Sequence, residues 1–91
     1  MKIVINTCYG GFGLSEESLA LYNQKAGTEL KYVFDIERTD PHLVAVVEEL
    51  GPIANGSFSS LKVVEIPDDV KWHISEYDGL EHIAEEHRTW Q

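Results

Sequence analysis

Three glycines within four positions interrupt the start of the chain, which reads IVINTCYGGFGLSEE from residue 3. A serine then stands where the N-cap of a helix belongs, directly before two glutamates. A loop between a strand and a helix offers unpaired N–H groups and the positive end of the helix dipole, which together favour a phosphate. The candidate ligand-binding residues of this loop are Tyr9, Gly10, Gly11, Phe12, Gly13, Leu14 and Ser15.

The same glycines are also typical of a tight turn. The pattern G-G-x-G matches neither the dinucleotide pattern G-x-G-x-x-G nor the P-loop, since no lysine follows it. Glu16 and Glu17 would also compete with a bound anion. The sequence therefore leaves two interpretations open: a ligand-binding loop, or a turn in which Tyr9 and Phe12 pack as anchors.

Two arginines could supply positive charge to a ligand. Arg38 and Thr39 precede an Asp-Pro pair, and Arg88 and Trp90 lie at the end of the sequence. Arginine offers a rigid fork of donors suited to phosphate, and a tryptophan ring can stack on a base. We add these four residues to the candidate ligand-binding site. Both arginines could instead pair with the surplus carboxylates of the chain.

Catalytic groups show no convincing arrangement. Cys8 ends a strand with no base placed beside it, which is more typical of a small core residue than of a nucleophile. His73 and His87 each begin an H-x-[ST] element, but they lie too close in sequence for a two-histidine phosphoesterase. His82 and His87 would lie about 140° apart around a helix, so no metal site is expected. We expect a binding protein and not an enzyme, with no cofactor.

Hydrophobic periodicity and turn residues predict seven elements that position these side chains. A contiguous apolar run indicates a central first strand, Asp40-Pro41 indicates a helix start, and Asp78-Gly79 indicates a turn. In chain order, the elements are a strand over residues 2–7, a helix from the Ser15 cap to Ala26, a strand over 30–34, a helix over 41–50, strands over 60–66 and 70–76, and a helix over 80–87.

The order β-α-β-α-β-β-α predicts one small domain over residues 1–91, of the α/β or α+β class, with two layers and helices packed on a mixed sheet. The first two strands are expected to be parallel, joined by a right-handed crossover. The strands over 60–66 and 70–76 are expected to form a hairpin-like pair. The glycine loop would then lie at the carboxyl ends of the parallel strands, where ligands collect.

Charge and composition exclude several classes of partner. Sixteen acidic against seven basic residues give a net charge of -9, which repels DNA and RNA. No apolar run approaches the length of a membrane span, and a single cysteine suits a reducing compartment. We therefore expect a cytoplasmic protein that binds neither nucleic acid nor membrane.

Four stretches that cover nearly the whole chain read MKIVINTCYGGFGLSEE, ERTDPHLVAVVEELG, ANGSFSSLKVVEIPDDV and EYDGLEHIAEEHRTW. Together they resemble a widespread family of small uncharacterised proteins encoded by phages and prophages. The resemblance implies a bacterial cytoplasm during infection, where small phage proteins often counter host defence. Viral sponges, one class of such proteins, bind cyclic-nucleotide or ADP-ribose-derived signals without cleaving them.

Three functions are therefore considered. The first is a nucleotide-binding protein that sequesters a host immune signal, with the loop holding phosphate and an aromatic ring stacking on a base. The alternative is an acidic inhibitor or adaptor that docks on a basic host protein or mimics nucleic acid, and the third is a nucleotide-cleaving enzyme. We also expect a homo-oligomer that shares its site between subunits, with Arg88, Thr89 and Trp90 at the interface.

Overall fold

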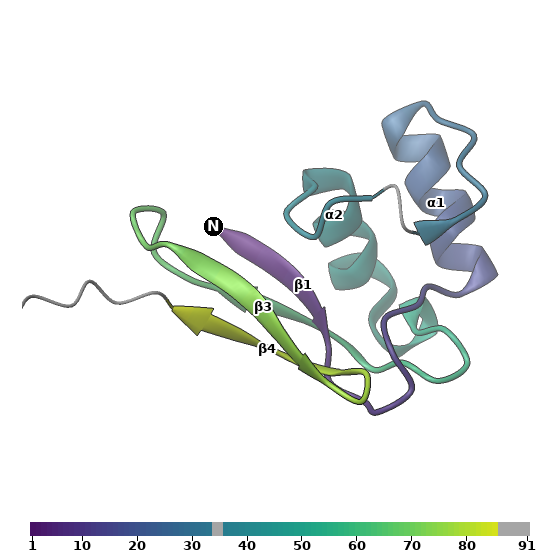
Figure 1. The fold of residues 1–91 in the computed structure, drawn as a ribbon. Coiled ribbons are helices and arrows are strands. Elements are labelled where there is room, and N and C mark those ends of the chain that lie inside the picture. The colour runs from purple at the N-terminus through teal and green to yellow at the C-terminus, as the bar shows by residue number, and fades with distance from the viewer. Residues whose placement is uncertain (34–35, 86–91) are drawn as a thin grey trace, which may run out of the picture.

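The computed structural model in Figure 1 describes residues 1–33 and 36–85. Its elements are β1 (Lys2–Asn6), α1 (Glu16–Ala26), α2 (Pro41–Leu50), the 3-10 helix η2 (Gly51–Ala54), β2 (Leu61–Glu65), β3 (Trp72–Tyr77) and β4 (Leu80–Glu85). Over these residues, α1 and α2 and four strands in two antiparallel sheets confirm the α+β class, with antiparallel pairing in place of the expected mixed sheet. Within the described ranges, no helix has the length and apolar character needed to cross a bilayer.

Strand β1 lies at the centre of the molecule and pairs antiparallel with β2. Its Val4 side chain packs among residues of the helices, including Leu43. Ile3 and Ile5 point to the opposite face and pack with the hairpin formed by β3 and β4, including Ile83. Figure 1 shows α2 and this hairpin on opposite sides of β1. The apolar run at the start of the chain is therefore buried on both faces, as its contiguity predicts.

Side-chain caps determine where the two helices begin. The Ser15 hydroxyl accepts a hydrogen bond from the backbone N–H of Ser18, at 3.2 Å, and Gly27 ends α1 with a φ of 70°. Asp40 accepts from the backbone N–H of His42, at 2.8 Å. Both helices have the bounds that these capping residues predict.

A partly buried hydrogen bond joins the two helices. The Tyr22 hydroxyl, on α1, donates to the second carboxylate oxygen of Asp40, the cap of α2, at 2.7 Å. Burial, this hydrogen bond and the Asp40 charge raise the pKa of Tyr22 to about 12. Burial alone would raise the pKa of Asp40, but hydrogen bonds from Tyr22 and the start of α2 outweigh it and lower that pKa. The Asp40 carboxylate therefore caps α2 and also binds the Tyr22 hydroxyl of α1.

The strand expected over residues 30–34 is wrong: residues 30–33 form no strand, and Phe34 lies outside the described residues. Leu30 exchanges hydrogen bonds with the Asn23 side chain, its N–H donating at 3.0 Å and its carbonyl accepting at 2.9 Å. The N–H of Ile36 donates to the carbonyl of Val33 at 3.1 Å. Because the backbone of this segment forms hydrogen bonds with the end of α1 and within the segment, residues 30–33 join no sheet. The expected parallel crossover is therefore absent from the described chain.

The helix expected over residues 80–87 is wrong over residues 80–85, and residues 86–87 lie outside the described residues. Residues 80–85 form β4, which pairs with β3. Asp78 and Gly79 have φ angles of 52° and 90°, as the two central positions of a tight hairpin turn require. Helix-favouring residues such as Glu81 and Ala84 are overridden by pairing and burial. The strand over 61–65 consequently pairs with β1 and not with β3, which corrects the expected hairpin-like pair.

Candidate functional site

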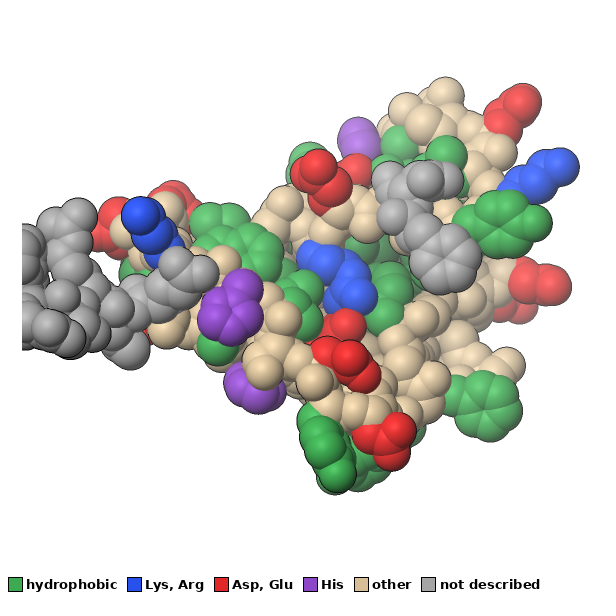
Figure 2. Space-filling view, in the orientation of Figure 1, with side chains coloured by type: hydrophobic (Ala, Val, Ile, Leu, Met, Phe, Trp, Pro, Cys, Tyr) green, Lys and Arg blue, Asp and Glu red, His purple; other side chains and the backbone are tan. Residues whose placement is uncertain are grey.

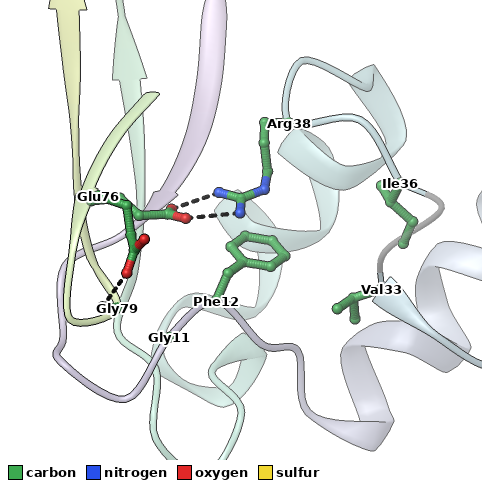
Figure 3. A pocket seen from close by; sticks show the side chains of 8 residues that line it. Gly11, Phe12, Val33, Ile36, Arg38, Glu76 and Gly79 are labelled. Carbon is green, nitrogen blue, oxygen red and sulfur yellow. Dashed lines mark hydrogen bonds and ion pairs between the residues drawn. The ribbon is translucent and has the colours of Figure 1, made fainter. Parts of the chain in front are cut away.

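A cleft of about 450 Å³ lies between the glycine loop, the segment before α2 and the β3–β4 hairpin. Figure 3 shows its lining side chains. One part of the lining is apolar and consists of Phe12, Val33 and Ile36. The other part is charged and consists of Arg38, Glu76 and Glu81, and the glycines of the two turns, Gly11 and Gly79, complete the cleft. The cleft therefore brings together segments from three regions of the chain.

Arg38 and Glu81 form a bidentate ion pair in this cleft. The two terminal nitrogens of Arg38 donate to the two carboxylate oxygens of Glu81, at 2.6 and 2.9 Å. Glu81 is only 8% exposed and also accepts from the backbone N–H of Asn6, at 2.8 Å. Burial alone would raise the pKa of Glu81, but the Arg38 hydrogen bonds, the Asn6 N–H and the Arg38 charge outweigh it and lower that pKa. Arg38 thus pairs with a surplus carboxylate.

The guanidinium of Arg38 also lies on the ring of Phe12, 3.6 Å from its centre. Figure 3 shows the ring beside the ion pair. A guanidinium over an aromatic face is attracted to the ring's negative quadrupole. The contact therefore attaches the glycine loop to the same arginine that bonds the hairpin.

Two carboxylates stand opposite each other on the hairpin wall of the cleft. Glu76 and Glu81 are direct cross-strand partners in the β3–β4 register. Like charges in such positions repel, and Arg38 offsets one of them. Glu76 is exposed and accepts from the N–H of Gly79, at 2.6 Å. One arginine against two carboxylates leaves the described lining with a charge of -1, which favours a neutral or cationic group over a phosphate.

Asn6 joins the segments around the cleft. It is 0% exposed, and its amide nitrogen donates to the carbonyls of Cys8 and Gly79, at 2.6 and 2.7 Å. Its amide oxygen accepts from the N–H groups of Cys8 and Ser60, at 3.2 and 2.9 Å. Every hydrogen-bonding position of this buried amide is therefore used, and one side chain holds three loops.

The glycine loop has structural reasons for its glycines. A Cβ atom at Gly10 would overlap the backbone and Cβ of Phe58, and Gly11 has a φ of 94°. Gly79 of the hairpin turn is packed equally closely, against Tyr9 and Gly11. Around Gly13, by contrast, a Cβ would meet no described atom within 4 Å. The loop is thus a tight turn at its first two glycines and also lines the cleft.

Alanine at Gly10 is therefore expected to lower the free energy of unfolding by about 1–3 kcal/mol, the usual cost of overpacking. Alanine at Gly13 is the matched control, because its φ lies outside the left-handed region and the space is open. Urea denaturation of both variants measures the difference. Equal stabilities would contradict the close approach of Gly10 to Phe58.

Of the predicted ligand-binding residues that the structure describes, three line the cleft together: Gly11, Phe12 and Arg38. Gly10 and Gly13 lie beside them in the loop, and Tyr9 is 62% exposed. Arg88 and Trp90 lie outside the described residues, and so does the oligomer interface expected at Arg88, Thr89 and Trp90.

Leu14, Ser15 and Thr39 line other clefts. Leu14 and Ser15 share theirs with Glu16 and Glu17, whose carboxylates oppose an anion. The Ser15 hydroxyl caps α1 and donates to the carbonyl of Ile53, at 2.6 Å. Thr39 lines a cleft near the N-terminus. These three residues therefore form no common site with Arg38.

Sequence reasoning missed Asn6, Glu76 and Glu81. The Asp-Gly pair flanked by strand-like residues is a hairpin signal that could have revealed the two glutamates. Alternation along such a hairpin places Glu81 on the face of Ile83 and opposite Glu76. No local signal indicates that Asn6 is buried.

No protein-family model, curated protein or solved structure matches the chain. Over residues 1–33 and 36–85, His, Cys, Asp and Glu side chains form no group of three that could hold a metal ion. The cleft geometry is therefore the basis for a functional interpretation.

Proposed function

We propose that the protein is a binding protein without catalytic activity, and that its cleft takes the nucleoside part of a nucleotide-derived molecule. In the setting implied by the resemblance to phage proteins, it would act in the cytoplasm of an infected bacterium. There it would sequester a cyclic-nucleotide or ADP-ribose-type immune signal. The observation that supports this proposal is the cleft that joins Gly11, Phe12 and Arg38.

The two parts of the cleft lining suit the two parts of a nucleoside. A base has flat apolar faces, which fit the side chains of Phe12, Val33 and Ile36. Ribose hydroxyls are donors, and the exposed carboxylate of Glu76 is an acceptor. The volume of about 450 Å³ lies in the usual range for small-molecule sites.

A phosphate is expected away from the charged part of this lining. Glu76 and the ion-paired Glu81 would repel it, and the charge of Arg38 is already offset. The N–H groups of Phe12 and Gly13 donate no hydrogen bond within the described ranges, so they are candidate phosphate donors on the loop. We therefore place the nucleoside in the cleft and the phosphate towards the loop.

The lining also supports binding without chemistry. Among the described residues of the cleft there is no serine, cysteine or histidine. Arg38 and the Asn6 N–H hold Glu81 ionised, with a lowered pKa, which is the opposite of what a general acid needs. A bound ligand would therefore be released from the cleft without chemical change.

Isothermal titration with adenosine and ADP-ribose tests the proposal. Glu76→Gln is expected to weaken adenosine binding about tenfold or more, because it replaces a charged hydrogen-bond acceptor by a neutral one. Glu17→Gln removes the same charge from an exposed residue outside this cleft and is expected to leave the affinity unchanged.

The proposal is contradicted if adenosine, ADP-ribose and a cyclic dinucleotide all fail to bind, and if protein incubated with an extract of infected cells releases no nucleotide-derived molecule on denaturation. Mass spectrometry of the released fraction provides the second measurement. Equal affinities of adenosine for both variants would remove Glu76 from the site.

A further inference from the structure

The end of the molecule that carries the glycine loop presents three exposed aromatic side chains. Tyr9, Phe58 and Tyr77 are 62%, 74% and 77% exposed. They belong to the β1–α1 connection, the η2–β2 connection and the end of β3. We call these three side chains the aromatic end.

The three segments lie against one another. A Cβ at Gly10 would overlap Phe58, and one at Gly79 would overlap the carbonyl of Tyr9. The buried side chain of Asn6 adds hydrogen bonds to each of the three connections. The backbone segments that carry the three rings are therefore held together, so a partner would meet a surface whose backbone is already ordered.

Acidic side chains lie on the same segments as the aromatic end or share a cleft with them. The β3–β4 turn region carries the exposed Glu76 and Asp78, and the η2–β2 connection shares a cleft with Glu16 and Glu17. Figure 2 shows hydrophobic and acidic side chains together at the lower end of this face, with no lysine or arginine among them. The chain as a whole has a net charge of -9.

We propose that the aromatic end is a docking surface for a basic segment of a partner protein, whose arginine side chains lie on the rings and pair with the neighbouring carboxylates. Exposed aromatic residues contribute strongly to protein interfaces. An arginine guanidinium combines stacking on a ring with pairing to a carboxylate. A second copy of this chain would bring the same negative charge, so charge favours a basic partner. None of the three aromatic residues lines the cleft, whereas the neighbouring Glu76 does, so variants of the aromatic residues test this surface independently of the nucleoside proposal.

Fluorescence anisotropy with labelled nona-arginine tests this surface at about 0.15 M salt, where the screening length is about 8 Å. The variants Tyr9→Ser, Phe58→Ser and Tyr77→Ser keep the net charge, so they leave the general attraction of the chain intact. Each is expected to weaken binding about fivefold or more, as interface anchors do. Tyr32→Ser is the control, since Tyr32 is 64% exposed and lies in the α1–α2 connection.

Nona-lysine has the same charge and is expected to bind more weakly than nona-arginine, because an ammonium group lacks the planar face that stacks on a ring. Absence of nona-arginine binding would overturn the proposal. Equal affinity of all four variants and the unaltered chain would also overturn it, since binding would then depend on charge alone. Circular dichroism of each variant verifies that the fold is retained.

Discussion

Replacing Arg38 by methionine is expected to lower the free energy of unfolding by about 3–5 kcal/mol, the cost of leaving a buried carboxylate without its partner. The affected carboxylate is that of Glu81, which is 8% exposed and receives two of its hydrogen bonds from Arg38. The variant also loses the stacking of the guanidinium on Phe12. Urea denaturation at neutral pH measures the change.

The double variant Arg38→Met, Glu81→Gln separates charge burial from packing. Glutamine keeps an acceptor for the N–H of Asn6 but carries no charge, so the double variant is expected to be more stable than Arg38→Met alone. A loss below about 1 kcal/mol for Arg38→Met would instead describe an ordinary surface ion pair.

The effect of Arg38→Met is expected to depend on pH. The pKa of Glu81 is lowered in the folded protein from its ordinary value of 4.5. The stability contributed by the ionised carboxylate is therefore fully present above pH 4.5 and is lost as the pH falls towards the lowered folded pKa. The difference between the two proteins should narrow over that acidic range, and a constant difference would contradict the assignment.

Replacing Asn6 by alanine is expected to destabilise the domain by about 3 kcal/mol or more, because the fully buried side chain makes four hydrogen bonds, each of which contributes about 0.5–1.5 kcal/mol. The groups affected are the carbonyls of Cys8 and Gly79 and the N–H groups of Cys8 and Ser60. Hydrogen exchange at the amide of Ser60 is expected to accelerate more than exchange within α2.

Asn23→Ala is the matched control for Asn6→Ala. Asn23 also uses its amide to hold a loop, through Leu30 and Thr28, but it is only half-buried. Its replacement is expected to cost about 1 kcal/mol, because water can satisfy the released groups. Similar losses for the two variants would contradict a special role for Asn6.

Local signals in the sequence predict the bounds of α1 and α2 well. The caps Ser15 and Asp40 and the stops Gly27 and Gly51 act through bonds within a few residues, so they can be recognised without a structure. The burial of β1 is likewise visible in the contiguous apolar run from Ile3. The pairing of the strands cannot be recognised from the sequence in this way, since partners such as Ile3 and Val64 are about sixty positions apart.

The candidate site likewise contains residues that could be predicted from the sequence and one that could not. Gly11 and Phe12 belong to one conspicuous loop, and Arg38 has a distinctive chemistry, so all three could be proposed from residue types alone. Glu81 resembles the other surface glutamates until β4 places it beside Arg38. Its role depends on a contact across 43 positions, which the helix expected there would not have predicted.

The position of the hairpin on β1 has a consequence for the order of folding. Ile3 and Ile5 are covered by residues of β3 and β4, which are synthesised much later. Until then, the apolar face of the first strand remains uncovered, and such a surface promotes aggregation. Contacts between distant segments also slow the closure of a chain. Newly made chains that stop before Trp72 would therefore depend on chaperones to remain soluble.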